Sequence, residues 1–167
     1  SGEDKAFLPV QYHEIASTLP ARLFQFRGLI DDAVARLFGE GLVDTEGLRS
    51  ADGTFSSGRY FRLAGVVYCM LEVNLRNWSE VAMTPMWLHV YGKGWKLSAE
   101  LQQVFEKAAD SGQLESYELP RQGKGMQVPI YIPLGLGREK TLDSIVTDVR
   151  KLAAILEEED LPSVLGI

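Results

Sequence analysis

Apolar residues return every three or four positions in three stretches of the chain, which is the spacing of an amphipathic helix. The three stretches are residues 21–38, 98–112 and 139–158. Phe24 and Phe38 widen the apolar stripe of the first, and Pro20 suits its start because proline fits the first helical turn. Residues 1–20 are expected to form an arm or a short helix. The chain is therefore predicted to contain three helices.

Runs rich in β-branched and aromatic residues lie between these helices and predict strands. The predicted strands are residues 59–64, 66–75, 86–91, 114–119 and 128–134. Gly65 joins the first two through a tight turn, and residues 42–58 are predicted to be a loop. Short connections favour antiparallel pairing, with the helices covering one face. The expected fold is a single α+β domain over residues 1–167, an antiparallel sheet of about five strands with three helices in the order α-β-β-β-α-β-β-α.

Side chains alternate between the two faces of a strand, so each predicted strand divides into two sets. One set is aliphatic, as in Val67, Cys69, Leu71 and Val73, and is expected to pack against the helices. The other set combines rings with polar and charged groups and is predicted to share the opposite face: Tyr60, Arg62, Tyr68, Glu72, Asn74, Trp87, His89, Tyr91 and Tyr131. Such side chains favour a surface that binds a partner protein or a small ligand. The alternative is that another segment or a partner subunit covers this face.

The composition favours a folded protein without a membrane-spanning segment. Hydrophobic residues make up 46% of the chain, and no apolar run approaches the roughly 20 residues that cross a bilayer. Seventeen basic and 23 acidic residues give a net charge of −6, which argues against nucleic-acid binding by bulk charge but leaves room for a local basic patch. The single cysteine, Cys69, cannot form an internal disulfide, so a cytoplasmic location is expected by default.

Few residues suggest catalysis, and no catalytic residue, metal site or cofactor is predicted. The two histidines, His13 and His89, lack other ligands at metal-binding spacing. No serine or cysteine lies in a nucleophile motif. Glu72 and His89 could form an acid–base pair across neighbouring strands, which keeps a small enzyme as an alternative.

One segment could bind an anion. Gly137, Arg138 and Lys140 lie where a strand leads into a helix, and backbone N–H groups at a helix start can hold a phosphate or carboxylate. The segment is not a P-loop and lacks the third glycine of a dinucleotide-binding motif. A plain turn between strand and helix is the alternative interpretation.

Two short basic loops raise the alternative of an accessory nucleic-acid-binding module. Their basic residues are Lys93, Lys96, Arg121 and Lys124. Solvated hairpin tips also carry such residues, so the pattern has a structural explanation as well. The first helix and the strand after residue 58 imitate a winged helix, but acidic residues offset the three arginines of that helix.

Several short motifs between residues 20 and 156 together resemble a known region. They are Gly58-Arg59-Tyr60-Phe61-Arg62-Leu63, Asn77-Trp78, Thr84-Pro85-Met86-Trp87-Leu88, Val128-Pro129-Ile130 and Ile132-Pro133-Leu134-Gly135. This set is similar to the region C-terminal to the nuclease core in bacterial PD-(D/E)XK nuclease-like proteins. That family binds magnesium with an acidic residue and a Glu-x-Lys motif on adjoining strands, and this chain has no such pair in a strand. The resemblance therefore implies the accessory part, without nuclease chemistry.

The predicted function is a non-catalytic recognition or interaction domain, accessory to a nuclease-like system, that binds through its aromatic sheet face. The partner would be a protein or a small ligand, with no cofactor and no membrane. The nucleic-acid-binding module and the small enzyme with the Glu72 and His89 pair remain the alternatives.

Overall fold

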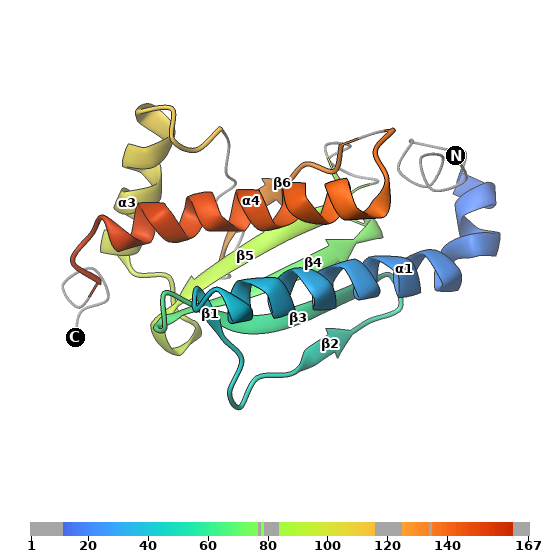
Figure 1. Cartoon of the computed structure of the whole chain (residues 1–167), viewed down its shortest axis with the longest axis horizontal. Helices are drawn as coiled ribbons and strands as arrows, with labels where there is room; N and C mark the ends of the chain where they lie inside the picture. Colours follow the sequence, from blue (N-terminus) through green and yellow to red (C-terminus); the bar gives the residue numbers. More distant parts are fainter. Residues whose placement is uncertain (1–11, 77, 79–83, 116–124, 134, 162–167) are drawn as a thin grey trace.

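The computed structural model of the protein describes residues 12–76, 78, 84–115, 125–133 and 135–161. In this part of the chain, two long helices lie side by side on one face of an antiparallel sheet, which confirms the α+β class (Figure 1). The elements, in chain order, are α1 Tyr12–Gly39, β1 Val43–Asp44, β2 Ser50–Asp52, β3 Ser56–Leu63, β4 Val67–Asn74, β5 Met86–Gly92, the 3₁₀ turn η2 Lys93–Trp95, α3 Ala99–Asp110, β6 Met126–Ile130 and α4 Arg138–Glu157.

The described sheet has six strands in the order β1-β3-β4-β5-β6, and β2 pairs with β3. Both β1 and β2 lie along the same edge of β3, where Val43 is opposite Leu63 and Ser50 is opposite Arg59. The loop predicted over residues 42–58 therefore contains two short strands and the start of β3, so that prediction is wrong. Strands of two and three residues carry too little alternation to be detected in the sequence, because their partner, not their own pattern, fixes them.

The tight turn predicted at Gly65 is confirmed. Val66 N–H donates to the Leu63 carbonyl at 3.3 Å, and the two residues between them have positive φ, 50° at Ala64 and 76° at Gly65. Positive φ at both central residues is the geometry of a type I′ hairpin turn, whose twist matches that of the flanking strands. This turn sets the register of β3 against β4.

Helix α1 is longer than predicted, because it begins at Tyr12 and continues through Pro20. Proline inside a helix removes one hydrogen bond and crowds the preceding turn, which usually kinks the helix. Figure 1 shows the N-terminal part of α1 turning away from the axis of the rest. Of the segment expected to be an arm or a short helix, residues 12–20 are helical and residues 1–11 lie outside the described part.

The buried face of α1 is narrower than predicted and lies on Phe26, Leu29, Ile30, Ala33 and Leu37. The two rings expected to widen it point to solvent: Phe24 is 77% exposed and Phe38 is 57% exposed. These two rings therefore lie outside the buried stripe of α1.

The two later helices are confirmed almost to the residue. The Ser98 hydroxyl accepts a hydrogen bond from the Leu101 N–H at 3.1 Å, which caps the start of α3. Helix α4 covers nearly all of the predicted range. Strand β6 begins two residues before its predicted start and ends at Ile130. Of the strand predicted over residues 114–119, residues 116–119 fall outside the described part, and Leu114 lies in a turn.

The core lies between the sheet and α1, α3 and α4, and the predicted alternation on β4 is confirmed. Val67, Cys69, Leu71 and Val73 are all fully buried, whereas alternate residues such as Tyr68 remain partly exposed. Burial raises the pKa of the Cys69 thiol, so this cysteine is held in its neutral form. None of the described helices is both long and apolar enough to cross a bilayer.

Candidate functional site

Four aromatic residues gather on the face of the sheet opposite α1 and α4, and we call them the aromatic face: Tyr60, Tyr68, Tyr91 and Trp95. The Trp95 ring is at the centre, with ring centroids 5.1 Å from Tyr60, 4.7 Å from Tyr68 and 5.3 Å from Tyr91. The contacts with Tyr60 and Tyr91 are edge-to-face, which is a favoured geometry for aromatic pairs. Trp95 nevertheless remains 42% exposed. The Trp95 ring is therefore held by three tyrosines and remains accessible to solvent.

An irregularity at the end of β5 carries Trp95 onto this face. Cys69 is opposite Val90 and Tyr68 is opposite Gly92, so Tyr91 is an extra residue in the pairing of β4 with β5. Gly92 has φ 80°, and a Cβ atom there would lie 2.5 Å from the Lys96 carbonyl oxygen. Only glycine allows this close approach of the backbone to itself, and the chain then turns through η2 back over the sheet.

Trp95 itself has φ 64°, in the left-handed region that a bulky residue rarely adopts. Such backbone strain costs about 1 to 3 kcal/mol and persists only where the surroundings impose it. The three tyrosine rings supply those surroundings. A strained, half-exposed tryptophan is a frequent mark of a binding site, and it distinguishes this turn from an ordinary solvated loop.

On the same face of the sheet, His89 and Glu72 form the pair that the sequence predicted across neighbouring strands. His89 Nε2 lies 2.6 Å from Glu72 Oε2, and the two side chains are only 9% and 12% exposed. The His89 ring also stacks on Tyr91, with centroids 6.2 Å apart and planes 15° apart. Because both side chains are largely buried, the pair is better placed to hold the Tyr91 ring than to reach a substrate.

Tyr91 links this buried pair to the surface. Burial, and to a lesser extent the nearby Tyr60 and Glu72, raises the pKa of Tyr91 to about 12. Its hydroxyl is therefore neutral and able to donate a hydrogen bond at every physiological pH.

Arg62 lies at the edge of the same face and is held there. Its guanidinium is paired with Asp44, donates to the Glu46 carbonyl at 3.3 Å and lies 6.0 Å from the centroid of the Tyr68 ring. Burial alone would lower the pKa of Arg62, but the contacts with Asp44 and Tyr68 outweigh it and raise that pKa. Arg62 therefore joins β3 to β1 and supports the edge of the cluster, leaving little of it free for a ligand.

Two other predicted site residues, Trp87 and Asn74, are not among the four residues of the aromatic face. Trp87 is fully buried, and no residue in the described part of the chain accepts a hydrogen bond from its Nε1. It cannot contact a ligand directly in this conformation. Asn74 is half-buried at the end of β4, where its backbone N–H donates to the Pro85 carbonyl at 2.7 Å. The second face of the sheet is thus covered around Trp87 and open around Trp95.

Tyr131 lies apart from the ring contacts described above. It follows the last residue of β6 and lines a cavity between β6 and α4. The alternation that placed it with the other rings requires a strand to residue 134, and β6 ends at Ile130. Beyond that point the two-residue period no longer applies.

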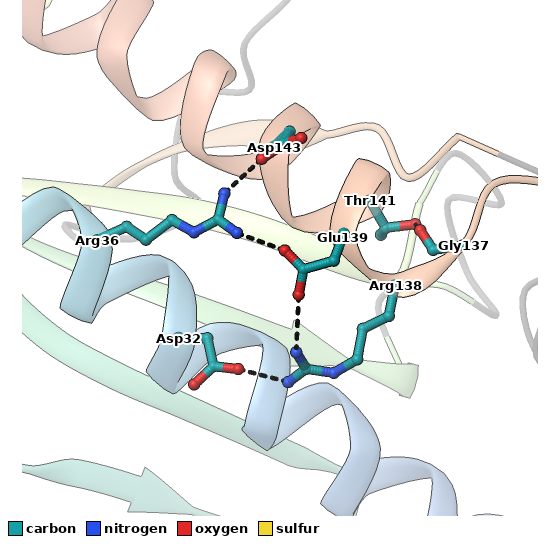
Figure 2. Close-up of polar contacts among 7 residues, drawn as sticks. All are labelled: Asp32, Arg36, Gly137, Arg138, Glu139, Thr141 and Asp143. Carbon is teal, nitrogen blue, oxygen red and sulfur yellow. Dashed lines mark hydrogen bonds and ion pairs between the residues drawn. The ribbon is translucent and has the colours of Figure 1, made fainter.

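The predicted anion-binding segment leads into a network of ion pairs between α1 and α4 (Figure 2). Arg138 is 2.5 Å from the carboxylate of Asp32 and 4.0 Å from that of Glu139. Arg36 is 2.7 Å from Glu139 and also pairs with Asp143. The guanidinium of Arg138 thus faces carboxylates on both helices.

The start of α4 shows no further sign of an anion site. The Thr141 hydroxyl donates to the Gly137 carbonyl at 3.1 Å, and Lys140 is exposed. Because the nearest guanidinium is already neutralised by carboxylates, this helix start is better explained as a structural joint between the helices.

Trp95 is the functional candidate that the sequence reasoning missed. It lies between Lys93 and Lys96 of a predicted basic loop, and nothing in the alternation of β5 predicts where a side chain beyond its end will lie. A signal was present in Gly92-Lys93-Gly94, two glycines that let the chain reverse direction just before a large ring. His13, Arg121 and Lys124 lie outside the residues whose side chains are described.

Neither a metal site nor a relative adds to this picture. Among the described residues, no three His, Cys, Asp or Glu side chains come close enough together to hold a metal ion. Comparison of the chain with family models, with curated proteins and with solved structures finds no match.

Proposed function

We propose that the chain is a recognition domain, without catalysis of its own, that binds a partner protein through the aromatic face. The observation that carries the proposal is Trp95: a large ring held at positive φ, packed on three tyrosines, and still 42% exposed. Tryptophan and tyrosine dominate the binding energy of protein interfaces because they offer large, rigid contact areas. A cluster of four such rings is a strong centre for an interface.

The state of the neighbouring residues on this sheet face favours recognition over catalysis. Trp87 is fully buried, and His89 and Glu72 are hydrogen-bonded to each other and largely covered. Buried and hydrogen-bonded neighbours restrict the rings before binding, so less conformational entropy is lost when a partner fixes them. None of the three described cavities is lined by the four aromatic residues, which suits a broad contact more than an enclosed substrate.

The charge around Trp95 indicates what such a partner looks like. Lys93 and Lys96 lie before and after Trp95 in the chain and are exposed, in a chain whose net charge is −6. A local basic rim on an acidic protein favours an acidic surface on the partner and disfavours self-association through the remaining surface. We therefore propose a partner segment that presents an apolar residue beside Asp or Glu.

The test is affinity selection from a random peptide library on the immobilised protein. Selected peptides are expected to bind Trp95→Ala at least tenfold more weakly than wild type, because the central ring is lost. Phe38→Ala is the matched control, since it removes another exposed aromatic ring, on helix α1. Peptides that bind Trp95→Ala as well as wild type would overturn the proposal, provided that circular dichroism shows the variant folded.

A second candidate, an accessory nucleic-acid-binding module, is favoured by the same two lysines beside an exposed ring. Base stacking on an aromatic platform combined with basic groups is how single strands are bound without sequence preference. Fluorescence anisotropy of a labelled oligonucleotide at two salt concentrations separates the candidates. Phosphate-driven binding of the oligonucleotide must weaken steeply with added salt, and no binding at low salt would exclude this candidate.

Two broader expectations remain proposals as well. The association with nuclease-like proteins rests on the sequence motifs alone, and binding through the aromatic face does not require it. A cytoplasmic location is proposed because the single cysteine, Cys69, is a free buried thiol, and free thiols are typical of reducing compartments.

A further inference from the structure

A cavity of about 310 Å³ lies between β6, the residues that follow α3, and α4. Its lining combines apolar side chains, among them Ile130, Leu152 and Ile155, with polar ones. The polar residues that line it include Ser144, Glu115 and Asp148. A cavity that offers both apolar contact area and a few polar groups is typical of small-molecule sites.

Asp148 is the distinctive group of this cavity. Burial raises the pKa of its carboxyl, the nearby charge of Glu115 raises it further, and Lys151 acts in the opposite direction. The Lys151 ammonium is 3.8 Å from Asp148, but the lysine side chain is 65% exposed, so it is a weak partner. The cavity therefore holds two carboxylates, with one loosely held cation at its rim.

We propose that this cavity binds a small organic cation, with a protonated amine placed at Asp148 and Glu115 and an apolar body packed on the walls. The amine would neutralise charge that the protein leaves poorly compensated. Tyr131 also lines the cavity, and an aromatic ring near the amine would add a favourable cation–π contact. An inorganic ion fits less well, because the described residues supply no third acidic, His or Cys ligand nearby.

The proposal fixes how binding depends on pH. An amine is attracted only by the ionised form of Asp148, whose pKa is raised, with Glu115 and Lys151 as the other charged groups that face it. Lowering the pH through the pKa of Asp148 therefore protonates the carboxyl and weakens binding, whereas the amine itself stays charged throughout.

Isothermal titration calorimetry of the whole chain with benzylamine, and with benzyl alcohol as its uncharged counterpart, tests the site. Benzylamine is expected to show saturable binding that falls at least tenfold in Asp148→Asn and is unchanged in Glu157→Gln, an exposed carboxylate on the same helix outside the cavity lining. Benzyl alcohol should bind wild type at least tenfold more weakly. Amide shifts in the protein spectrum around Ile130 and Leu152 should locate the amine.

Several results would overturn the site. They are no saturable binding of benzylamine by wild type, equal loss in Asp148→Asn and Glu157→Gln, or equal affinity for the amine and the alcohol. The outcome is independent of the aromatic face, because Trp95→Ala should leave benzylamine binding unchanged. If the protein binds benzylamine but selects no peptides, the amine site stands and partner binding through the aromatic face is overturned.

Discussion

His89 and Glu72 are joined by a hydrogen bond of 2.6 Å between Nε2 and Oε2, and the His89 ring stacks on Tyr91. Replacing His89 with alanine leaves the Glu72 carboxylate largely covered and without this partner. Breaking a buried pair by removing one member costs about 3 to 5 kcal/mol, and we expect about 2 kcal/mol here because both groups retain some contact with water. Urea unfolding of His89→Ala measures the loss. A loss no larger than that of Phe38→Ala would contradict a structural role for the pair.

A methyl group at Gly92 should displace Trp95. The Cβ atom would collide with the Lys96 carbonyl, and the residue would also be strained by its φ of 80°. We expect Gly92→Ala to lower the free energy of unfolding by about 2 to 4 kcal/mol and to change the signals of the Trp95 indole in the NMR spectrum.

Gly65→Ala is the matched control for that variant. Gly65 has a similar φ of 76°, but a Cβ atom there meets nothing within 4 Å. It should cost about 1 kcal/mol, from backbone strain alone, and leave the Trp95 signals in place. Equal effects of the two substitutions would show that the close approach at Gly92 does not position the ring.

The stability of the protein should fall in strongly alkaline solution, partly through Tyr91. The pKa of Tyr91 is raised to about 12 in the folded chain, whereas a tyrosine in the unfolded chain ionises near its ordinary value of about 10. The unfolded state therefore loses its proton first, and stability is lost as the pH rises from about 10 through 12. Allowing for partial exposure, we expect Tyr91 to account for about 1 kcal/mol. Urea unfolding of wild type and Tyr91→Phe at pH 8 and pH 11 isolates this contribution.

Removing the charge of Asp148 should not destabilise the protein at neutral pH. Its pKa is raised, so the contribution of Asp148 to stability is complete below the unfolded value and is lost as the pH rises through the folded value. Above that point the ionised carboxylate is a net cost. We expect Asp148→Asn to be neutral or to stabilise by less than about 1 kcal/mol at pH 7, measured by thermal unfolding. A clear destabilisation would mean that Asp148 makes an essential structural contact.

Features of the fold that repeat within one element could be predicted from the sequence. The alternation in β4 separates Leu71 from Tyr68, and the Ser98 cap marks the start of α3, because both depend on residues a few positions apart. The pairing of β1 and β2 with β3 could not be predicted, since two and three residues carry no period of their own. The helix boundary predicted at Pro20 is wrong, because α1 continues through this residue although proline removes one helical hydrogen bond.

The candidate site was predicted in part for the same reason. The alternation correctly predicted one shared face for four residues: Tyr60, Tyr68, Tyr91 and His89. It does not predict how much of a side chain other segments cover, and Trp87, which was expected on that exposed face, is fully buried. Trp95 was missed because its position follows from the bulge at Tyr91 and from backbone angles beyond the strand. The charge partner of Arg138 was missed because Asp32 is more than a hundred residues away in the chain.

The burial of Cys69 gives this molecule an internal reporter of its own opening. The thiol sits in the middle of the central strand β4, and it is the sole cysteine in the chain. A thiol reagent can react with it only when the sheet and helices part, so the labelling rate measures how often that happens. Each substitution discussed above can thus be compared with wild type under native conditions, without denaturant or an added probe.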